Sequence, residues 1–171
     1  MEMDISSLQG TELFQGLSPV QIGKVLNICH AVNFSENEII MKEGEIGDSM
    51  YIIQQGTVEV IKRLILAGID DDESNDKSKV FTKLDAANRH PVFGEIALLQ
   101  ESKRTATVRA ITDGILCEIK KSDFLSLAEA DFELGYRILF NLAGIVSARL
   151  RKADDDTVKL TTVLSMILKE T

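Results

Sequence analysis

The sequence predicts a mainly β protein with flanking helices: an antiparallel β jelly-roll sandwich with an N-terminal helix and a long C-terminal helix. Apolar residues follow helical spacing before residue 34 and again after residue 121. Between these segments, short runs of β-forming residues are separated by glycines and other turn residues. This order of helix, several short strands and helix favours an antiparallel sandwich or jelly roll.

The chain has 171 residues, of which 44% are hydrophobic, so it is long enough to bury a core as one domain. We divide it into a helical lead-in (1–33), a β region (34–121) and C-terminal helices (122–171). The net charge of −8 would repel phosphate backbones, which argues against DNA binding. The acidic N-terminus does not resemble a signal peptide, and no apolar stretch approaches the roughly 18 residues of a membrane span. We therefore expect a cytoplasmic protein with no membrane contact.

Cysteine and histidine are rare. Cys29 and Cys117 lie in different segments, and the histidines are His30 and His90. We expect two buried thiols rather than a disulfide framework. No cluster of these residues has the spacing of a metal site, so no metal is expected.

A short helix is expected ahead of the β region, with Ser18 as its N-cap and Pro19 at its first position. From residue 34, apolar runs are interrupted by Gly44, Gly47 and Gly56, which is typical of short strands joined by turns.

Further along, "TATVRAITDGILCEIKK" consists of two β-rich runs flanking Asp113-Gly114, a favoured hairpin turn, and predicts a β-hairpin. The acidic stretch at 67–79 is expected to be a solvated loop that does not fit a calcium-binding pattern, and the role of its acidic residues at 70–76 stays open.

After Lys121 the helical period returns. Ser122 is expected to cap "DFLSLAEA", and a longer helix should run from about Asp131 past Lys152. Apolar residues at alternating spacings of three and four form a heptad pattern there. This heptad seam comprises Ala143, Val146, Leu150, Ala153, Thr157, Leu160, Leu164 and Ile167. The seam packs either on the protein's own sheet or on a second chain, and we favour a homodimer through residues 143–167.

The stretch "FGEIALLQESKRTATVRA" places Glu95 and Arg104 in an otherwise apolar, β-forming segment. A buried guanidinium without a partner is costly, so the two charges either pair with each other or bind a ligand. The guanidinium fork matches phosphate oxygens, and a carboxylate accepts hydrogen bonds from sugar hydroxyls. Gly94 permits a tight turn, and "EIALL" could begin a short helix whose first amides face an anion. A small nucleotide would satisfy all these groups.

The same stretch resembles the phosphate-binding cassette of the cyclic nucleotide-binding domain, a family that includes catabolite activator proteins and protein kinase A regulatory subunits. "LFQGLSPVQIGKVL", "GEIGDSMYIIQQGTVEV" and "SDFLSL" resemble other parts of that domain, so the resemblance covers roughly residues 11–152. It implies a ligand site formed by Phe93, Gly94, Glu95, Ile96, Ala97, Arg104, Thr105 and Ala106.

The resemblance also implies individual roles. Glu95 would accept the ribose 2′-hydroxyl, and Arg104 would pair with the cyclic phosphate. Backbone amides of Ile96, Ala97 and Ala106 would add phosphate contacts. The Thr105 hydroxyl would lie near the phosphate and fits either base. The C-terminal helix would cover the base with one or more of Arg149, Arg151, Lys152, Ala153 and Asp154, in a register that the sequence leaves open.

The expected ligand is 3′,5′-cyclic AMP, with cyclic GMP as the alternative, and no other cofactor. We see neither a helix-turn-helix nor a catalytic motif, so the interpretation is a stand-alone regulatory sensor that acts by moving its C-terminal helix, alone or through a partner protein. An enzyme is the weaker reading, because no metal site or nucleophile is present, and no catalytic residue is expected. The remaining alternative is an oligomerisation or adaptor scaffold with a vestigial pocket.

Overall fold

The computed structural model describes residues 10–63, 78–87, 91–100 and 102–169. Its helical elements are η1 (Glu12–Phe14), α2 (Pro19–Leu26), α3 (Ile96–Leu99), α4 (Lys121–Ala130) and α5 (Phe132–Lys169). Its strands are β1 (His30–Phe34), β2 (Ile39–Met41), β3 (Ile46–Gly47), β4 (Ser49–Gln55), β5 (Thr57–Arg63), β6 (Ser78–Asp85), β7 (Val92–Phe93), β8 (Ser102–Lys103), β9 (Thr107–Ala110) and β10 (Gly114–Lys120).

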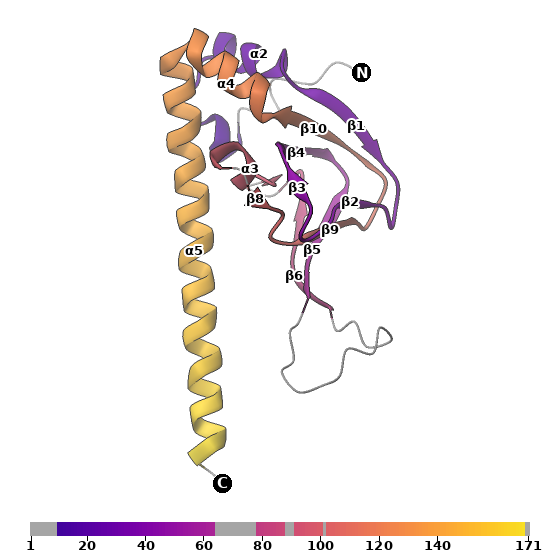
Figure 1. Ribbon diagram of the computed structural model, residues 1–171, viewed down its shortest axis with the longest axis vertical. Helices are drawn as coiled ribbons and strands as arrows, with labels where there is room; N and C mark the ends of the chain where they lie inside the picture. Colours follow the sequence, from indigo (N-terminus) through magenta and orange to yellow (C-terminus); the bar gives the residue numbers. More distant parts are fainter. Residues whose placement is uncertain (1–9, 64–77, 88–90, 101, 170–171) are drawn as a thin grey trace.

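The strands form two four-stranded sheets and one short strand pair. The sheet orders are β1-β10-β4-β7 and β2-β9-β5-β6, with β3 paired to β8. The paired strands run antiparallel. Helices lie at both ends of the chain, and the long α5 runs beside the β region and extends past it (Figure 1). The predicted fold class is therefore confirmed.

Strand side chains alternate between the two faces of a sheet, so the sheet β1-β10-β4-β7 contributes to two hydrophobic cores, one on each face. Between the two large sheets lie Phe34, Met41, Ile53, Val58, Phe93, Val108, Ala110 and Leu116. On the helix-facing side, α2, α4 and α5 pack on strands β4 and β10. The largest buried side chains of this second core include Phe14, Ile22, Met50, Ile52, Phe124, Leu134, Leu142 and Ile145.

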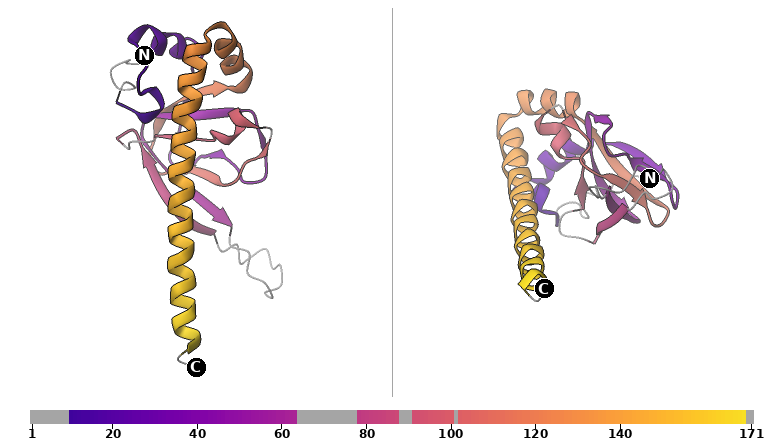
Figure 2. Two further views of the ribbon diagram at one scale, coloured as in Figure 1. Left: turned by 90° about the vertical axis from the view of Figure 1, so that its left-hand side faces the viewer. Right: turned by 60° about the horizontal axis from the view of Figure 1, so that its bottom comes forward.

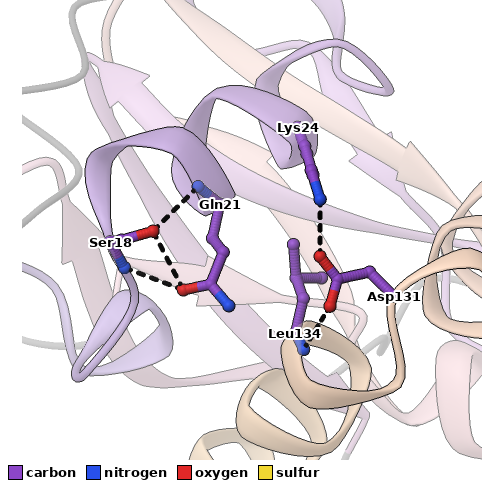
Figure 3. Close-up of polar contacts among 5 residues, drawn as sticks. All are labelled: Ser18, Gln21, Lys24, Asp131 and Leu134. Atoms are coloured by element: carbon purple, nitrogen blue, oxygen red, sulfur yellow. Dashed lines mark hydrogen bonds and ion pairs between the residues drawn. The ribbon is translucent and has the colours of Figure 1, made fainter.

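The N-terminal helix begins as predicted. Ser18 accepts a hydrogen bond from the Gln21 amide, and the Gln21 side chain accepts one from the Ser18 amide, with Pro19 in the first turn (Figure 3). At the other end of α2, Lys24 Nζ lies 2.6 Å from Asp131 Oδ2. Asp131 also accepts a hydrogen bond from the Leu134 amide at the start of α5. One carboxylate thus fixes the α4–α5 junction to α2.

The predicted hairpin around Asp113-Gly114 is wrong. β9 pairs with β2 and β5, whereas β10 pairs with β1 and β4, so the chain crosses from one sheet to the other at this point. Gly114 is needed for close packing instead of a turn: a Cβ there would lie 2.2 Å from the Gln55 carbonyl oxygen and 2.3 Å from the ring of Phe34. Local sequence favoured a hairpin, but pairing with distant strands decided the path.

Two boundaries also differ from expectation. Strand β1 begins at His30, ahead of the change of period at residue 34. Ser122 does not cap α4, because the helix already begins at Lys121, and the Ser122 hydroxyl instead donates to Asp123. The glycine-marked strands are confirmed, with Gly44 and Gly56 at positive φ. The acidic stretch at 70–76 lies outside the described residues.

The two cysteines form a disulfide, contrary to the expected thiols. Cys29 follows α2 and Cys117 lies in β10, with their Cα atoms 5.4 Å apart. Cys117 is fully buried beside β1, where it pairs with Ala31 in the strand register. Sequence spacing of 88 residues gave no sign of this proximity, which depends on the pairing of β1 with β10.

Only the N-terminal part of the long helix α5 packs against the rest of the chain. Leu134, Ile138, Leu142 and Ile145 are buried against the rest of the chain. Residues 151–168 of the helix are exposed, and Figure 2 shows the helix projecting from the β region. No helix in the described ranges is both long and apolar enough to cross a membrane.

Candidate ligand-binding site

Arg104 lies between β8 and β9, and its backbone is held by the turn before β3. Its amide donates to the Glu45 carbonyl at 2.7 Å, and its carbonyl accepts from the Gly44 amide at 2.9 Å. Gly44 has a φ of 88°, which suits glycine. The glycine-rich turn of the sequence therefore sets the backbone position of the predicted phosphate-binding residue.

The Arg104 guanidinium fits between two glycines. A Cβ on Gly47 would lie 2.0 Å from Arg104 Nε, and one on Gly94 would lie 2.7 Å from its Nη1. Arg104 Nη1 donates to the carbonyl of Ser49 at 2.7 Å and to that of Gly94 at 3.2 Å, and Nη2 donates to the Ser49 hydroxyl at 3.3 Å. Among the described side chains, Arg104 has no carboxylate partner. This half-buried cation therefore has donors left for an anion.

Glu95 is buried, with 6% of its surface exposed, at the start of α3. It follows Gly94, whose φ of 72° makes the tight turn that the sequence predicted. Its carboxylate does not pair with Arg104. Arg149 Nη1 of α5 donates to Glu95 Oε1 at 2.7 Å instead. Glu95 Oε2 makes no hydrogen bond to the described residues, so one oxygen stays available to a hydroxyl donor.

Arg149 is the residue whose position the sequence could not fix. Besides the Glu95 contact, its Nη2 donates to the Val92 carbonyl in β7 at 2.6 Å. It lies one turn beyond Ile145, the last buried apolar residue of α5. Residues four apart lie on one face of a helix, so the apolar spacing that buries Leu142 and Ile145 also turns Arg149 toward the sheet. Of the five candidates on this helix, Arg149 reaches the site.

A polar group on β4 and β10 lies behind Arg104. The Ser49 hydroxyl donates to the Tyr51 hydroxyl at 3.2 Å, and Tyr51 donates to Glu118 Oε1 at 3.1 Å. The Tyr51 ring stacks on Phe93 with centroids 5.1 Å apart, and the Arg104 guanidinium lies 5.8 Å from its centre. Burial raises the pKa of Tyr51, so the phenol is protonated at neutral pH.

Sequence reasoning included Phe93 but missed Ser49, Tyr51 and Glu118. Tyr51 and Glu118 are register partners on neighbouring strands, and Ser49 and Tyr51 share one face of β4. A possible sequence signal was the polar residue at every second position of otherwise apolar strands.

The other predicted residues surround the two charges. Ala97 and Ala106 are buried, Ile96 is half-buried, and Thr105 is exposed. The Ala97 amide donates to the Gly94 carbonyl at 3.1 Å within the turn, so it serves the turn in this structure. The site thus offers a cation, a carboxylate with one oxygen available and the Tyr51 ring, a combination that suits an anionic ligand with hydroxyl groups.

The fold and the site together define a ligand-binding domain. A model of the cyclic nucleotide-binding domain matches residues 31–131. This range includes the described strands β2 to β10, all of β1 except His30, and the segment from Gly94 to Arg104. The chain belongs to the cyclic nucleotide-binding domain family.

Relatives differ widely in length. The chain is 26% identical over 140 residues to cGMP-dependent protein kinase isozyme 1 of Drosophila melanogaster, covering 72% of this chain and 17% of that protein. It is 27% identical over 147 residues to the cyclic AMP receptor protein of Thermus thermophilus, covering 86% and 61%. The catabolite activator protein of that organism shares the fold, with a TM-score of 0.73 and 24% identity over 88% of this chain and 63% of that one. The chain thus spans less than two thirds of the length of each of these three proteins.

Proposed function

We propose that this chain is a sensor that binds a 3′,5′-cyclic nucleotide and transmits binding through α5. One observation carries the proposal: the Arg104 guanidinium lies between Gly47 and Gly94, half-buried and without a carboxylate partner in the described part of the chain. A cation held in this way has donors for a phosphate, and charge-assisted bonds of this kind contribute about 1.5–3 kcal/mol each.

We propose the following roles, which the contacts within the site support. Arg104 pairs with the cyclic phosphate, assisted by backbone amides at Ile96 and Ala106. Glu95 accepts the ribose 2′-hydroxyl on Oε2, while Arg149 holds Oε1. Phe93, Gly94, Ala97 and Thr105 complete the lining. Because the cyclic phosphate and the ribose are common to both nucleotides, these residues fit cyclic AMP and cyclic GMP alike.

The base is covered by α5. Lys152 and Ala153 lie three and four residues beyond Arg149, so they share the helix face that Arg149 turns toward the site. Asp154 lies five residues beyond and faces elsewhere on the helix. We propose Lys152 and Ala153 as the residues next to the base.

Ligand binding shifts the C-terminal helices about the α4–α5 junction. Asp131 ends α4, and Gly135 allows a close approach: a Cβ there would lie 2.6 Å from the Ala128 Cβ. A ligand can move the helix only if it binds the conformation with the helix closed over the site more tightly than the open conformation. Spin labels on exposed residues 147 and 162 of α5, each paired with a label on β5, should report changed distances when cyclic nucleotide is added. Unchanged distances in nucleotide-saturated protein would refute the movement.

We propose that α5 transmits this shift to a second copy of the chain. The seam residues are exposed, except for half-buried Val146. All of them but Ala153 lie off the face through which α5 packs on its own domain, and Ala153 lies where the two faces meet. The spacing of four and three continues backward through Leu139, Tyr136 and Phe132, which are also exposed. The apolar seam therefore follows the whole helix, which is about 57 Å long at 1.5 Å per residue.

Isothermal titration tests the binding proposal. Cyclic AMP and cyclic GMP are titrated separately into protein freed of carried-over nucleotide by unfolding and refolding, with 5′-AMP as the control. Binding of a cyclic nucleotide but not of 5′-AMP is the expected result, and the stronger of the two ligands identifies the base. Heat from none of the three, with circular dichroism showing folded protein, would refute the sensor.

In that case the exposed seam favours the second candidate, an oligomerisation or adaptor scaffold with a vestigial pocket. Titration and light scattering together identify it, because a scaffold self-associates through the seam but binds none of the three nucleotides.

A further inference from the structure

We infer that Ser49, Tyr51 and Glu118 are positioning residues for Arg104, forming a chain of hydrogen bonds that holds the guanidinium from behind and leaves its other side to an anion. The inference deepens the proposed function, since it concerns the same arginine. None of the three residues is required to touch the ligand.

The hydrogen bonds run in one direction. Arg104 Nη2 donates to the Ser49 hydroxyl at 3.3 Å, Ser49 donates to the Tyr51 hydroxyl at 3.2 Å, and Tyr51 donates to Glu118 Oε1 at 3.1 Å. The chain starts at a cation and ends at an anion. Each hydroxyl can donate only once, so this orientation satisfies the cation and the carboxylate together. Hydrogen bonds aligned in this way polarise and strengthen one another.

The residues of this hydrogen-bond chain lie on paired β-strands. Tyr51 faces Glu118 across the β4–β10 ladder and Phe93 across the β4–β7 ladder. Its ring stacks on Phe93 and supports the guanidinium at 5.8 Å. Ser49 is buried, with 2% of its surface exposed, so its hydroxyl has little freedom to leave. The pairing of β4 with β10 thus places the Tyr51 hydroxyl next to its acceptor, Glu118.

The charge arrangement explains why a distant carboxylate is useful. A carboxylate in direct contact with Arg104 would compete with a phosphate for the same donors. Glu118 compensates the positive charge across two hydroxyl groups and leaves Nε free of hydrogen bonds to the described residues. Burial raises the pKa of Tyr51, which keeps the phenol proton in place to donate to Glu118.

The test is Tyr51→Phe, which keeps the stacked ring and removes one hydroxyl. Thr162→Val, which also removes one hydroxyl, is the control, because Thr162 is exposed on α5 and lies off the seam. The first readout needs no ligand: the Nε–Hε signal of Arg104 in protein labelled with nitrogen-15 arginine, assigned by its loss in Arg104→Lys. The second readout is the affinity for cyclic AMP and cyclic GMP by titration.

Tyr51→Phe should move the Arg104 signal and weaken cyclic nucleotide binding about five- to tenfold, the loss expected for one hydrogen bond. In the Arg104→Lys background the same change should cost much less, because a lysine cannot donate to Ser49 and to a phosphate in the same way. Thr162→Val should change neither readout. Glu118→Gln provides a second variant, with Glu129→Gln on the surface of α4 as its control.

An unmoved Arg104 signal in Tyr51→Phe overturns the inference, even if affinity falls. So does a full loss of affinity that persists in the Arg104→Lys background. If the wild-type protein binds neither cyclic nucleotide, the proposed function fails. The ligand-free signal then decides the inference by itself, so the two failures are distinguishable.

Discussion

Arg149 of the long helix is bonded to Glu95 of the cassette, with Nη1 of the arginine 2.7 Å from Oε1 of the carboxylate. The contact joins residues 54 positions apart and links the buried carboxylate to the long helix α5. Because Glu95 is 6% exposed, removing its partner leaves a buried charge uncompensated. Arg149 is therefore the structural partner of Glu95 and connects α5 to the start of α3.

Arg149→Ala should lower the free energy of unfolding by about 1–2 kcal/mol, a value below that of a fully buried pair because the arginine is partly exposed. Denaturant unfolding measures the change. Glu95→Gln in the same background should recover part of the loss, since a neutral amide is cheaper to bury than a lone carboxylate. Arg151→Ala, at an exposed position, is the control. Equal effects of the two arginine substitutions would contradict the proposed role of the ion pair.

Arg104→Ala should weaken cyclic nucleotide binding about 100-fold or more, because at least two charge-assisted bonds to the phosphate are lost. Glu95→Ala should weaken binding through the ribose. Titration measures both effects, and circular dichroism checks the fold. If either variant bound like the wild type, that residue's assignment to the pocket would be wrong.

Gly47→Ala tests the position of Arg104 without changing its charge. The new Cβ would lie 2.0 Å from Arg104 Nε, so the guanidinium must move. We expect a loss of affinity of at least tenfold, again measured by titration. Gly23→Ala in α2 is the control, because a Cβ there meets nothing within 4 Å. Retained affinity in Gly47→Ala would show that Arg104 does not need this site to bind the phosphate.

Asp131→Asn should remove a pH-dependent contribution to stability. Hydrogen bonds from Lys24 and from the Leu134 amide hold the pKa of Asp131 below its ordinary value. A carboxyl with a lowered pKa in the folded protein stabilises it above the unfolded pKa, about 3.9, and this contribution is lost as the pH falls through the folded value.

The difference in melting temperature between wild type and Asp131→Asn should therefore be largest near pH 7 and shrink below about pH 4. Asp155→Asn, exposed on α5, is the control. A difference that stays constant with pH would mean that Asp131 does not act through its charge.

Leu160→Glu should disrupt self-association through the seam, since it places a carboxylate at a seam position of both copies. Light scattering across a concentration series measures the mass. Val158→Glu is a close control, because Val158 is similarly exposed but lies off the seam. If both variants or neither changed the mass, the seam would not be the interface.

The sequence determined the elements whose signals are local. Ser18 and Pro19 define the start of α2, glycines mark the strands, and helical periodicity after Lys121 predicts the long helix. Glu95 and Arg104 could be selected because charged residues in an apolar segment require partners. These features depend on neighbours within a few residues, which a sequence displays directly.

Tertiary structure decided every question that depended on residues far apart in the chain. It sent β9 and β10 to different sheets, although Asp113-Gly114 favours a hairpin, because each strand gains more from its distant partners. It brought Cys29 and Cys117 together as a disulfide. It also paired Glu95 with Arg149 instead of with Arg104. It also assembled Ser49, Tyr51 and Glu118 behind the arginine. Strand register and helix rotation set these contacts, and both are products of packing the whole chain.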